Sequence, residues 1–175
     1  MNTVETAHLN LREMNDNDAP FYLEMLSDPD FKANIGDRGL LTLEDALFHM
    51  QDRIYSSYEA HGFGMYLVSR SSDGAAVGMA GLVQREFLKY VDVGYAFLPR
   101  GRGQGFATEA AAACVELARA RFGLRRLAAI TDPQNVASIR VLEKLGFHQD
   151  GTVKFPDDGD MCAYFELELK KYNQN

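Results

Sequence analysis

A glycine-rich turn between an apolar run and a helix-forming run constrains this chain more than any other feature. The turn follows an apolar run over 90–98 and reads Arg100-Gly-Arg-Gly-Gln-Gly105. An alanine-rich run over 108–122 comes after it and favours a helix. Glycines at alternate positions let the backbone approach a ligand without a Cβ, and a helix N-terminus offers unpaired N–H groups to an anion. The segment therefore predicts a phosphate-binding loop between a strand and a helix.

Two well-known phosphate loops do not fit this turn. A Walker A loop needs Gly-Lys followed by Ser or Thr, and the turn has no such sequence. The dinucleotide-binding fingerprint needs a third glycine three residues after the second, where Phe106 or Thr108 stands. The pattern that remains is Arg100-x-x-Gly103-x-Gly105. Its alternative interpretation is a plain glycine-rich turn that caps a helix.

The rest of the chain alternates strand and helix signals. A turn signal at 71–74 joins two apolar runs into a predicted hairpin, and Thr42 with Asp45 resembles a capping box at a helix start. Such an alternation indicates a mixed α/β sheet with a crossover. The predicted strands are 8–14, 63–68, 76–83, 90–98, 126–131, 147–154 and 161–169, and the predicted helices are 18–26, 42–58, 108–122 and 135–145.

Length and charge narrow the class of protein. The chain has 175 residues without an internal repeat or linker, so we expect one domain over 1–175. Its formal net charge of -7 argues against binding to the phosphate backbone of nucleic acids and mildly favours cationic partners. No apolar run approaches the roughly 18 residues of a membrane helix, and the start does not resemble a signal peptide. We therefore expect a cytoplasmic protein with no nucleic-acid or membrane partner.

Cysteine and histidine spacing gives no metal or disulfide signature. Cys114 and Cys162 lie far apart, which fits a reducing compartment, and Cys114 shares a predicted helix face with alanines, as buried packing does. The four histidines show no ligand spacing, and His61 is the one most worth testing. We expect no metal.

A second motif stands about thirty residues after the glycine-rich turn. It reads Asn135-Val-Ala-Ser138, followed by Lys144-Leu-Gly-Phe147. Taken alone, this motif predicts an amphipathic helix that ends at a glycine. Together the two motifs resemble the GNAT N-acetyltransferases, whose acetyl-CoA loop reads Gln/Arg-x-x-Gly-x-Gly/Ala. Asp92-Val-Gly-Tyr95 and the opening run 8–12 resemble the branch of that family that acetylates the N-terminal alanine of ribosomal proteins.

The resemblance implies the GNAT fold, a mixed and centrally splayed sheet flanked by helices, with acetyl-CoA as co-substrate. The pantetheine would pair with the strand that ends at Leu98, the pyrophosphate would meet the N–H groups of 102–107, and Asn135 would bond the pantetheine arm. The arginines of the turn would add positive charge, with solvated surface arginines as the alternative. The implied cofactor-binding residues are Tyr95, Phe97, Leu98, Arg100, Arg102, Gly103, Gln104, Gly105, Phe106, Ala107, Asn135 and Ser138.

The implied catalytic residues are Ser138, Asp92 and Asn135. Many members of the family carry a tyrosine seven residues after the asparagine, where it can protonate the leaving thiolate, and this chain has Leu142 there. Either Ser138 takes that role or the thiolate leaves unassisted. Asp92 would accept a proton from the incoming ammonium directly or through water, with a solvent-facing strand carboxylate as the competing interpretation.

The expected activity is transfer of acetyl from acetyl-CoA to a primary amine by direct attack, with a protein N-terminus as the acceptor. The alternatives are transfer to a small-molecule amine, such as a polyamine or an antibiotic, and a non-catalytic acyl-CoA-binding module. The region 31–41 would shape the acceptor site. The expected assembly is a monomer or a homodimer.

Overall fold

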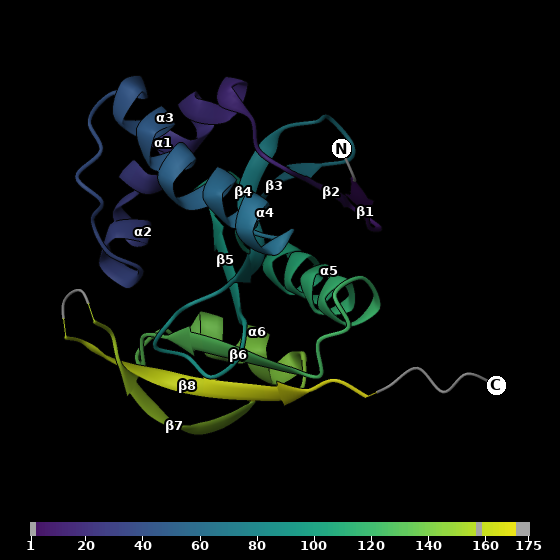
Figure 1. Cartoon of the computed structure of the whole chain (residues 1–175). Helices are drawn as coiled ribbons and strands as arrows, with labels where there is room; N and C mark the ends of the chain where they lie inside the picture. Colours follow the sequence, from purple (N-terminus) through teal and green to yellow (C-terminus); the bar gives the residue numbers. More distant parts are fainter. Residues whose placement is uncertain (1–2, 157–158, 171–175) are drawn as a thin grey trace.

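The computed structural model describes residues 3–156 and 159–170, and its centre is one eight-stranded sheet (Figure 1). The strand order is β1-β2-β3-β4-β5-β6-β8-β7. The β5–β6 pair is parallel and the other neighbours are antiparallel. The strands are β1 (Val4–Glu5), β2 (Leu9–Arg12), β3 (Met65–Arg70), β4 (Ala76–Val83), β5 (Asp92–Phe97), β6 (Arg126–Thr131), β7 (His148–Lys154) and β8 (Met161–Glu168).

Helices cover both faces of this sheet. They are α1 (Ala19–Ser27), α2 (Pro29–Asn34), α3 (Leu43–Met50), α4 (Ser56–His61), α5 (Phe106–Ala120) and α6 (Val136–Lys144). Short 3-10 turns over Asp16–Asp18 and Pro99–Gly101 precede α1 and follow β5. No helix in the described part of the chain is long and apolar enough to span a membrane.

The predicted helix over 42–58 is confirmed, with an interruption that its sequence pattern does not indicate. Thr42 accepts from the N–H of Asp45 while the Asp45 carboxylate accepts from the N–H of Thr42, so the capping box is present. A π-helical turn over Gln51–Tyr55 then joins α3 to α4. Hydrophobic spacing locates the helix, but a single wide turn hardly disturbs that spacing.

Two elements have no counterpart in the sequence prediction. The short strand β1 extends the sheet beyond β2, with Val4 opposite Leu11. The six-residue helix α2 begins after Asp28, whose carboxylate accepts from the N–H of Phe31. Both are too short to show a hydrophobic period, although Asp28-Pro29 is a recognisable helix start.

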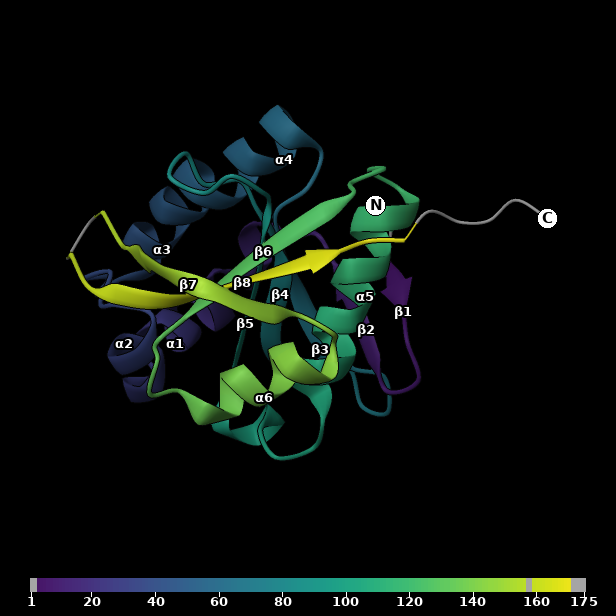
Figure 2. The same ribbon diagram turned by 90° about the horizontal axis from the view of Figure 1, so that it is seen from below.

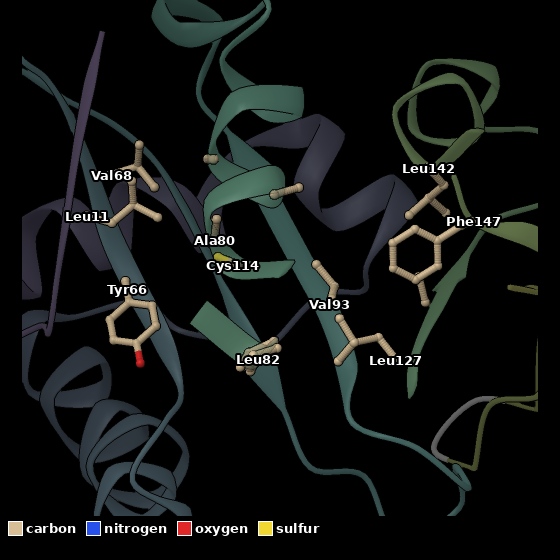
Figure 3. Close-up of a cluster of buried hydrophobic side chains, with 14 of the residues drawn as sticks. Leu11, Tyr66, Val68, Ala80, Leu82, Val93, Cys114, Leu127, Leu142 and Phe147 are labelled. Atoms are coloured by element: carbon tan, nitrogen blue, oxygen red, sulfur yellow. The ribbon is translucent and has the colours of Figure 1, made fainter. Parts of the chain in front are cut away.

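The hydrophobic core forms two layers, one on each face of the sheet. Helices α1 to α4 pack on one face, and α5 and α6 lie on the other (Figures 1 and 2). Cys114 of α5 is fully buried in the core layer that α5 forms with the sheet, as predicted (Figure 3). Leu142 of α6 is 1% exposed and lies beside Phe147 in the same layer (Figure 3).

The sheet splits at its centre. Strand β5 pairs with β4 along its whole length, from Asp92 opposite Val83 to Phe97 opposite Gly78. On its other side β5 pairs with β6 only where Asp92 meets Ala128. The two strands then diverge, so that β6, β8 and β7 run across the direction of β5 in Figure 1. The predicted mixed sheet with a central splay is therefore confirmed.

Candidate functional site

A large cleft of about 2010 Å³ opens where β5 and β6 separate. One wall is β5 from Val93 to Phe97, and the other includes α6 and the segment 130–135 before it. The loop over 101–105 and the start of α5 close one end. Helices α1 to α4, together with residues 155–156 and 160–162, line the opposite end. The sequence motifs at 100–105 and 135–138 thus meet at a single cleft.

The glycine-rich loop has the conformation that its glycines allow. Gly103 and Gly105 have φ values of 71° and 79°, which L side chains rarely adopt, and no other residue lies within 4 Å of where a Cβ would stand. Helix α5 begins at Phe106, two residues earlier than predicted, with Gly105 as its N-cap. The first N–H groups of an α-helix have no intrahelical acceptor, so this end of the cleft presents donors to an anion.

Nine of the twelve predicted cofactor-binding residues line the cleft, and three do not. Leu98, Arg100 and Gln104 are absent from the lining that the described residues form. Leu98 is 2% exposed, and its N–H donates to Val77 of β4, so it faces away from the open edge of β5. Gln104 donates its side-chain amide to the carbonyl of Arg100. The nine are Tyr95, Phe97, Arg102, Gly103, Gly105, Phe106, Ala107, Asn135 and Ser138.

The two arginines of the turn bind acidic groups on α1 and α2. Arg100 donates to both carboxylate oxygens of Glu24, at 2.5 and 2.9 Å. Arg102 donates to Asp28 at 2.6 Å and also to Asp30. Their guanidinium groups therefore join the glycine-rich loop to the opposite helical layer, and phosphate binding by these side chains stays a prediction.

The open edge of β5 exposes backbone groups to the cleft. The carbonyl of Val91 accepts from the N–H of Ala128 across the β5–β6 contact, at 2.8 Å. Because backbone groups alternate along a strand, the carbonyl of Val93 and both backbone groups of Tyr95 point to the same edge, beyond the end of the pairing. The carbonyl of Phe97 accepts from Nε of Arg102 at 2.7 Å. An extended ligand that lies along β5 therefore meets unpaired strand edge at Val93 and Tyr95.

Asn135 and Ser138 stand together at the start of α6. Asn135 is the N-cap, and its Oδ1 accepts from the N–H of Ser138 at 3.1 Å. The cap uses the oxygen of the side chain, which leaves its NH₂ group directed to other acceptors. The Ser138 hydroxyl lies 3.0 Å from the hydroxyl of Tyr95 on the facing strand. The structure thus brings these three predicted residues to one place.

Asp92 is buried at the closed end of the split. It is 2% exposed, so the interpretation of a solvent-facing strand carboxylate is wrong. Its Oδ2 accepts from Nε of Arg85 at 2.7 Å. Its Oδ1 is buried and has no hydrogen-bond partner among the described residues. Burial raises the pKa of Asp92, against the opposing effects of Arg85 and the Ile130 backbone. Arg85 lines the cleft, whereas Asp92 does not, so Arg85 stands between the carboxylate and the cleft.

The family follows from a comparison of the whole fold and its motifs with known proteins. The family model described as an acetyltransferase (GNAT) domain matches residues 8–148. The chain belongs to the GNAT acetyltransferase family. The match includes the glycine-rich loop, β5 and the start of α6, which are the elements that form the cleft.

Similar proteins extend the likeness along the chain. YkkB of Bacillus subtilis (strain 168), an uncharacterized protein, is 35% identical over 98 residues, which are 55% of this chain and 57% of YkkB. The chain thus spans a little over half the length of YkkB. The uncharacterized N-acetyltransferase YoaA of the same organism is 26% identical over 153 residues, or 86% of this chain and 85% of YoaA. RimL, a ribosomal L7/L12 alpha-N-protein acetyltransferase solved in complex with coenzyme A, shares the fold with a TM-score of 0.80, 19% identity, and coverage of 96% of this chain and 98% of that one.

The far end of the GNAT cleft holds a pair of side chains that the sequence interpretation missed. The Tyr22 hydroxyl lies 2.9 Å from Nδ1 of His49, and both residues line the cleft. Burial lowers the pKa of His49, with a further contribution from the nearby Arg38 and Arg53. His49 and Arg53 are four residues apart on the predicted helix 42–58, so their shared face was a usable signal. His61, preferred from the sequence, is exposed and stacks on Phe63, although it also lines the cleft.

Aromatic side chains from two loops adjoin Arg85 at this end. The Arg85 guanidinium lies 5.7 Å from the centroid of the Phe155 ring. Phe87 packs edge-on against Phe155, with centroids 5.4 Å apart. All three residues line the cleft, beside the segment that links β7 to β8. This end of the cleft is therefore lined from both halves of the sheet.

Proposed function

We propose that this GNAT domain transfers an acetyl group from acetyl-CoA to a primary amine by direct attack, without an acyl-enzyme. One observation carries the proposal. The glycine-rich loop, with Gly103 and Gly105 at positive φ, places the N-terminus of α5 at the end of a cleft that runs along the unpaired edge of β5. Backbone donors for a pyrophosphate and a strand edge for an extended amide chain thus lie on one path.

Groups along the cleft match the successive parts of coenzyme A, from the pyrophosphate to the pantetheine arm. The N–H groups at the start of α5 face the pyrophosphate, with Phe106 contributing only backbone because its ring is buried. The edge of β5 at Val93 and Tyr95 pairs with the pantetheine amides. The NH₂ group of Asn135 donates to the same arm from the opposite wall, while its oxygen caps α6.

The protein provides electrostatic help at the reacting centre. Acetyl-CoA supplies an activated acetyl thioester, and its thiol, with a pKa of roughly 8.5, is a tolerable leaving group. A backbone N–H on the β5 edge polarises the thioester carbonyl. Ser138 lies at the N-terminus of α6 and assists departure of the thiolate, since Leu142 is buried and has no proton to donate.

Asp92 takes the proton of the incoming ammonium through water rather than directly. The carboxylate is buried behind Arg85, which excludes contact with the amine but not with a water bound between them. Its raised pKa makes it a better proton acceptor than an exposed aspartate. Arg85, paired with Asp92, presents little net charge to a cationic substrate.

The acceptor that we propose is a protein or peptide N-terminus. Asp92-Val-Gly-Tyr95 and Asn135-x-x-Ser138 resemble the branch that acetylates N-terminal alanine, and RimL, which shares the fold, bears the name of an alpha-N-protein acetyltransferase. An α-amino group has a pKa near 8 and a lysine side chain near 10.4, so at neutral pH the N-terminus is neutral roughly hundreds of times more often. An N-terminal amine therefore needs less help from a general base than a lysine side chain does.

A panel of amines tests this function. The protein is supplied with acetyl-CoA and, in parallel, peptides that begin with Ala or Ser, spermidine, and an amino-sugar antibiotic, and thiol release is recorded. We expect turnover with a peptide, and mass spectrometry should place the acetyl group on its N-terminus. Turnover confined to spermidine or the antibiotic would replace the peptide by a small amine. Coenzyme A binding without turnover of any amine would favour a non-catalytic acyl-CoA-binding module.

A further inference from the structure

Tyr95 and Ser138 face each other across the cleft from elements that are distant in the sequence. Tyr95 lies in β5 and Ser138 in the first turn of α6. The Tyr95 hydroxyl donates to the backbone carbonyl of Ser138 at 3.1 Å and lies 3.0 Å from Ser138 Oγ. The two hydroxyls therefore form one hydrogen-bonded unit on the wall of the cleft.

The acceptor to which Tyr95 donates decides where the Ser138 proton points. A phenol and a serine hydroxyl each carry one proton, and each oxygen also accepts. When Tyr95 donates to the Ser138 carbonyl, the serine proton is drawn to the phenol oxygen. When Tyr95 donates to Ser138 Oγ instead, the serine proton is left to point into the cleft. An anion in the cleft favours the second arrangement, because a hydrogen bond from the serine hydroxyl to an anion is stronger than the neutral bond from Tyr95 to the Ser138 carbonyl that is given up.

The backbone of Ser138 is held independently of this choice. Its N–H donates to Asn135 Oδ1 at the N-cap, so the position of the Cα does not depend on Tyr95. Leu142, one turn further along α6, is buried in the core and offers no donor. Within this part of α6, Ser138 is the hydroxyl that Tyr95 can direct.

We infer that Tyr95 is a positioning residue for the leaving group: its hydroxyl holds Ser138 Oγ so that the serine proton points at the thioester sulfur. This inference rests on the proposed function. Burial raises the pKa of Tyr95 to about 12, while a coenzyme A thiol has a pKa of roughly 8.5. The phenol therefore keeps its proton and acts through Ser138 as a hydrogen-bond donor.

The proton balance of the step is simple. The amine nitrogen forms a bond to the acetyl carbon, and the carbon–sulfur bond breaks with its electron pair on sulfur. The Ser138 hydroxyl donates a hydrogen bond to that sulfur and keeps its proton. The proton released by the amine passes through water to Asp92 and from there to solvent, and the thiolate takes up a proton from solvent as it leaves.

Kinetics of Tyr95→Phe, Ser138→Ala and the double variant test this unit. Tyr95→Phe should lower kcat about fivefold, as loss of one hydrogen bond predicts, with little change in KM for acetyl-CoA. Ser138→Ala should lower kcat more, by about 10²-fold, because it removes the donor to the negative charge that develops on sulfur. The double variant should be no slower than Ser138→Ala, because Tyr95 acts only through Ser138. An acetyl thioester with a more acidic thiol should recover most of the loss in both single variants.

Tyr164→Phe is the matched control. The Tyr164 hydroxyl also donates a hydrogen bond, to Glu166 at 2.9 Å, but the residue does not line the cleft within the described part of the chain. The kcat of Tyr164→Phe, and the dependence of this kcat on the acidity of the leaving thiol, should equal those of the unsubstituted protein. The inference would be overturned by a Tyr95→Phe variant with unchanged kcat, or by a double variant whose losses multiply.

A measurement without turnover separates this inference from the proposed function. The pKa of the thiol of bound coenzyme A is titrated through the absorbance of the thiolate. We expect the protein to lower this pKa below that of free coenzyme A, and Tyr95→Phe to raise it again by about 0.7 unit, the equivalent of fivefold. A lowered pKa in a protein that acetylates no amine would overturn the function and retain the Tyr95–Ser138 unit. The inference would be overturned by equal thiol pKa values in the unsubstituted protein and in Tyr95→Phe, or by a protein that does not bind coenzyme A.

Discussion

Arg102 in the glycine-rich loop donates to Asp28 at the N-terminus of α2, and the two residues are separated by 74 positions in the sequence. Asp28 is 8% exposed, and its Oδ1 also accepts from the N–H of Phe31. Nε of the same guanidinium donates to the carbonyl of Phe97 at the end of β5. One side chain thus joins the glycine-rich end of the cleft to α2, where the region 31–41 begins.

Arg102→Gln should therefore weaken acceptor binding as well as coenzyme A binding. It removes the ion pairs to Asp28 and Asp30 and leaves a buried carboxylate with one backbone donor, so we expect a loss of about 1–2 kcal/mol in the free energy of unfolding. KM for the acceptor should rise together with KM for acetyl-CoA. Urea unfolding and steady-state kinetics measure the two effects. Arg70→Gln, which breaks an exposed pair with Asp73, is the control and should leave both KM values unchanged.

Gly103→Val should abolish coenzyme A binding while the domain stays folded. A valine there places atoms in the space in front of α5 and costs about 1–2 kcal/mol in backbone strain, because φ is positive. Gly74→Val is a matched control, since Gly74 has a φ of 72°, has open space around its Cβ position and lies in the turn before β4. Calorimetry should detect coenzyme A binding to Gly74→Val and no binding to Gly103→Val. Equal affinity in the two variants would contradict the assignment of the loop.

Asp92 and Arg85 should control the acidic limb of the pH–rate profile. Burial raises the pKa of Asp92 and Arg85 lowers it, so Arg85→Gln should move the limb to higher pH. Asp92→Asn should shift the limb upward, to the pKa of the amine itself, and should slow lysine-like amines more than α-amines, which are more often neutral. Profiles of kcat/KM for a peptide N-terminus and for spermidine test both variants. A limb that keeps its position in Asp92→Asn would exclude Asp92 as the proton acceptor.

The Arg12–Asp18 pair should make stability depend on pH in the acid range. Burial alone would raise the pKa of Asp18, but the bidentate pair with Arg12 and the N–H of Asn15 bring it below its usual value. A depressed pKa contributes stability that is present above about 3.9, the unfolded value, and is lost as pH falls through the folded value. Asp18→Asn should cost about 1.5–3 kcal/mol at pH 7 and less at pH 3. Urea unfolding at the two pH values tests this, with the exposed Glu143→Gln as the control.

Local patterns in the sequence determined most of the elements and one end of the site. Two apolar runs joined by the turn signal at 71–74 located the hairpin of β3 and β4, and the Thr42 capping box located the start of α3. The glycine-rich turn identified the phosphate end, because positive φ and a helix N-terminus depend on a few adjacent residues. The motif at 135–138 was equally local, since Asn135 caps the helix that carries Ser138.

Only the tertiary structure decided how these pieces act together. The side chains of Arg100 and Arg102 form ion pairs with α1 and α2, Asp92 is buried rather than solvent-facing, and Tyr95 meets Ser138 across 43 positions. Such contacts depend on how far β5 and β6 separate and on which helices pack beside them. The spacing of apolar residues within a helix or strand indicates which of its faces is buried. It does not indicate which distant side chain packs against that face. The sequence therefore determined the glycine-rich loop and the helix start at one end of the cleft, and the packing of the two half-sheets decided which groups share the cleft.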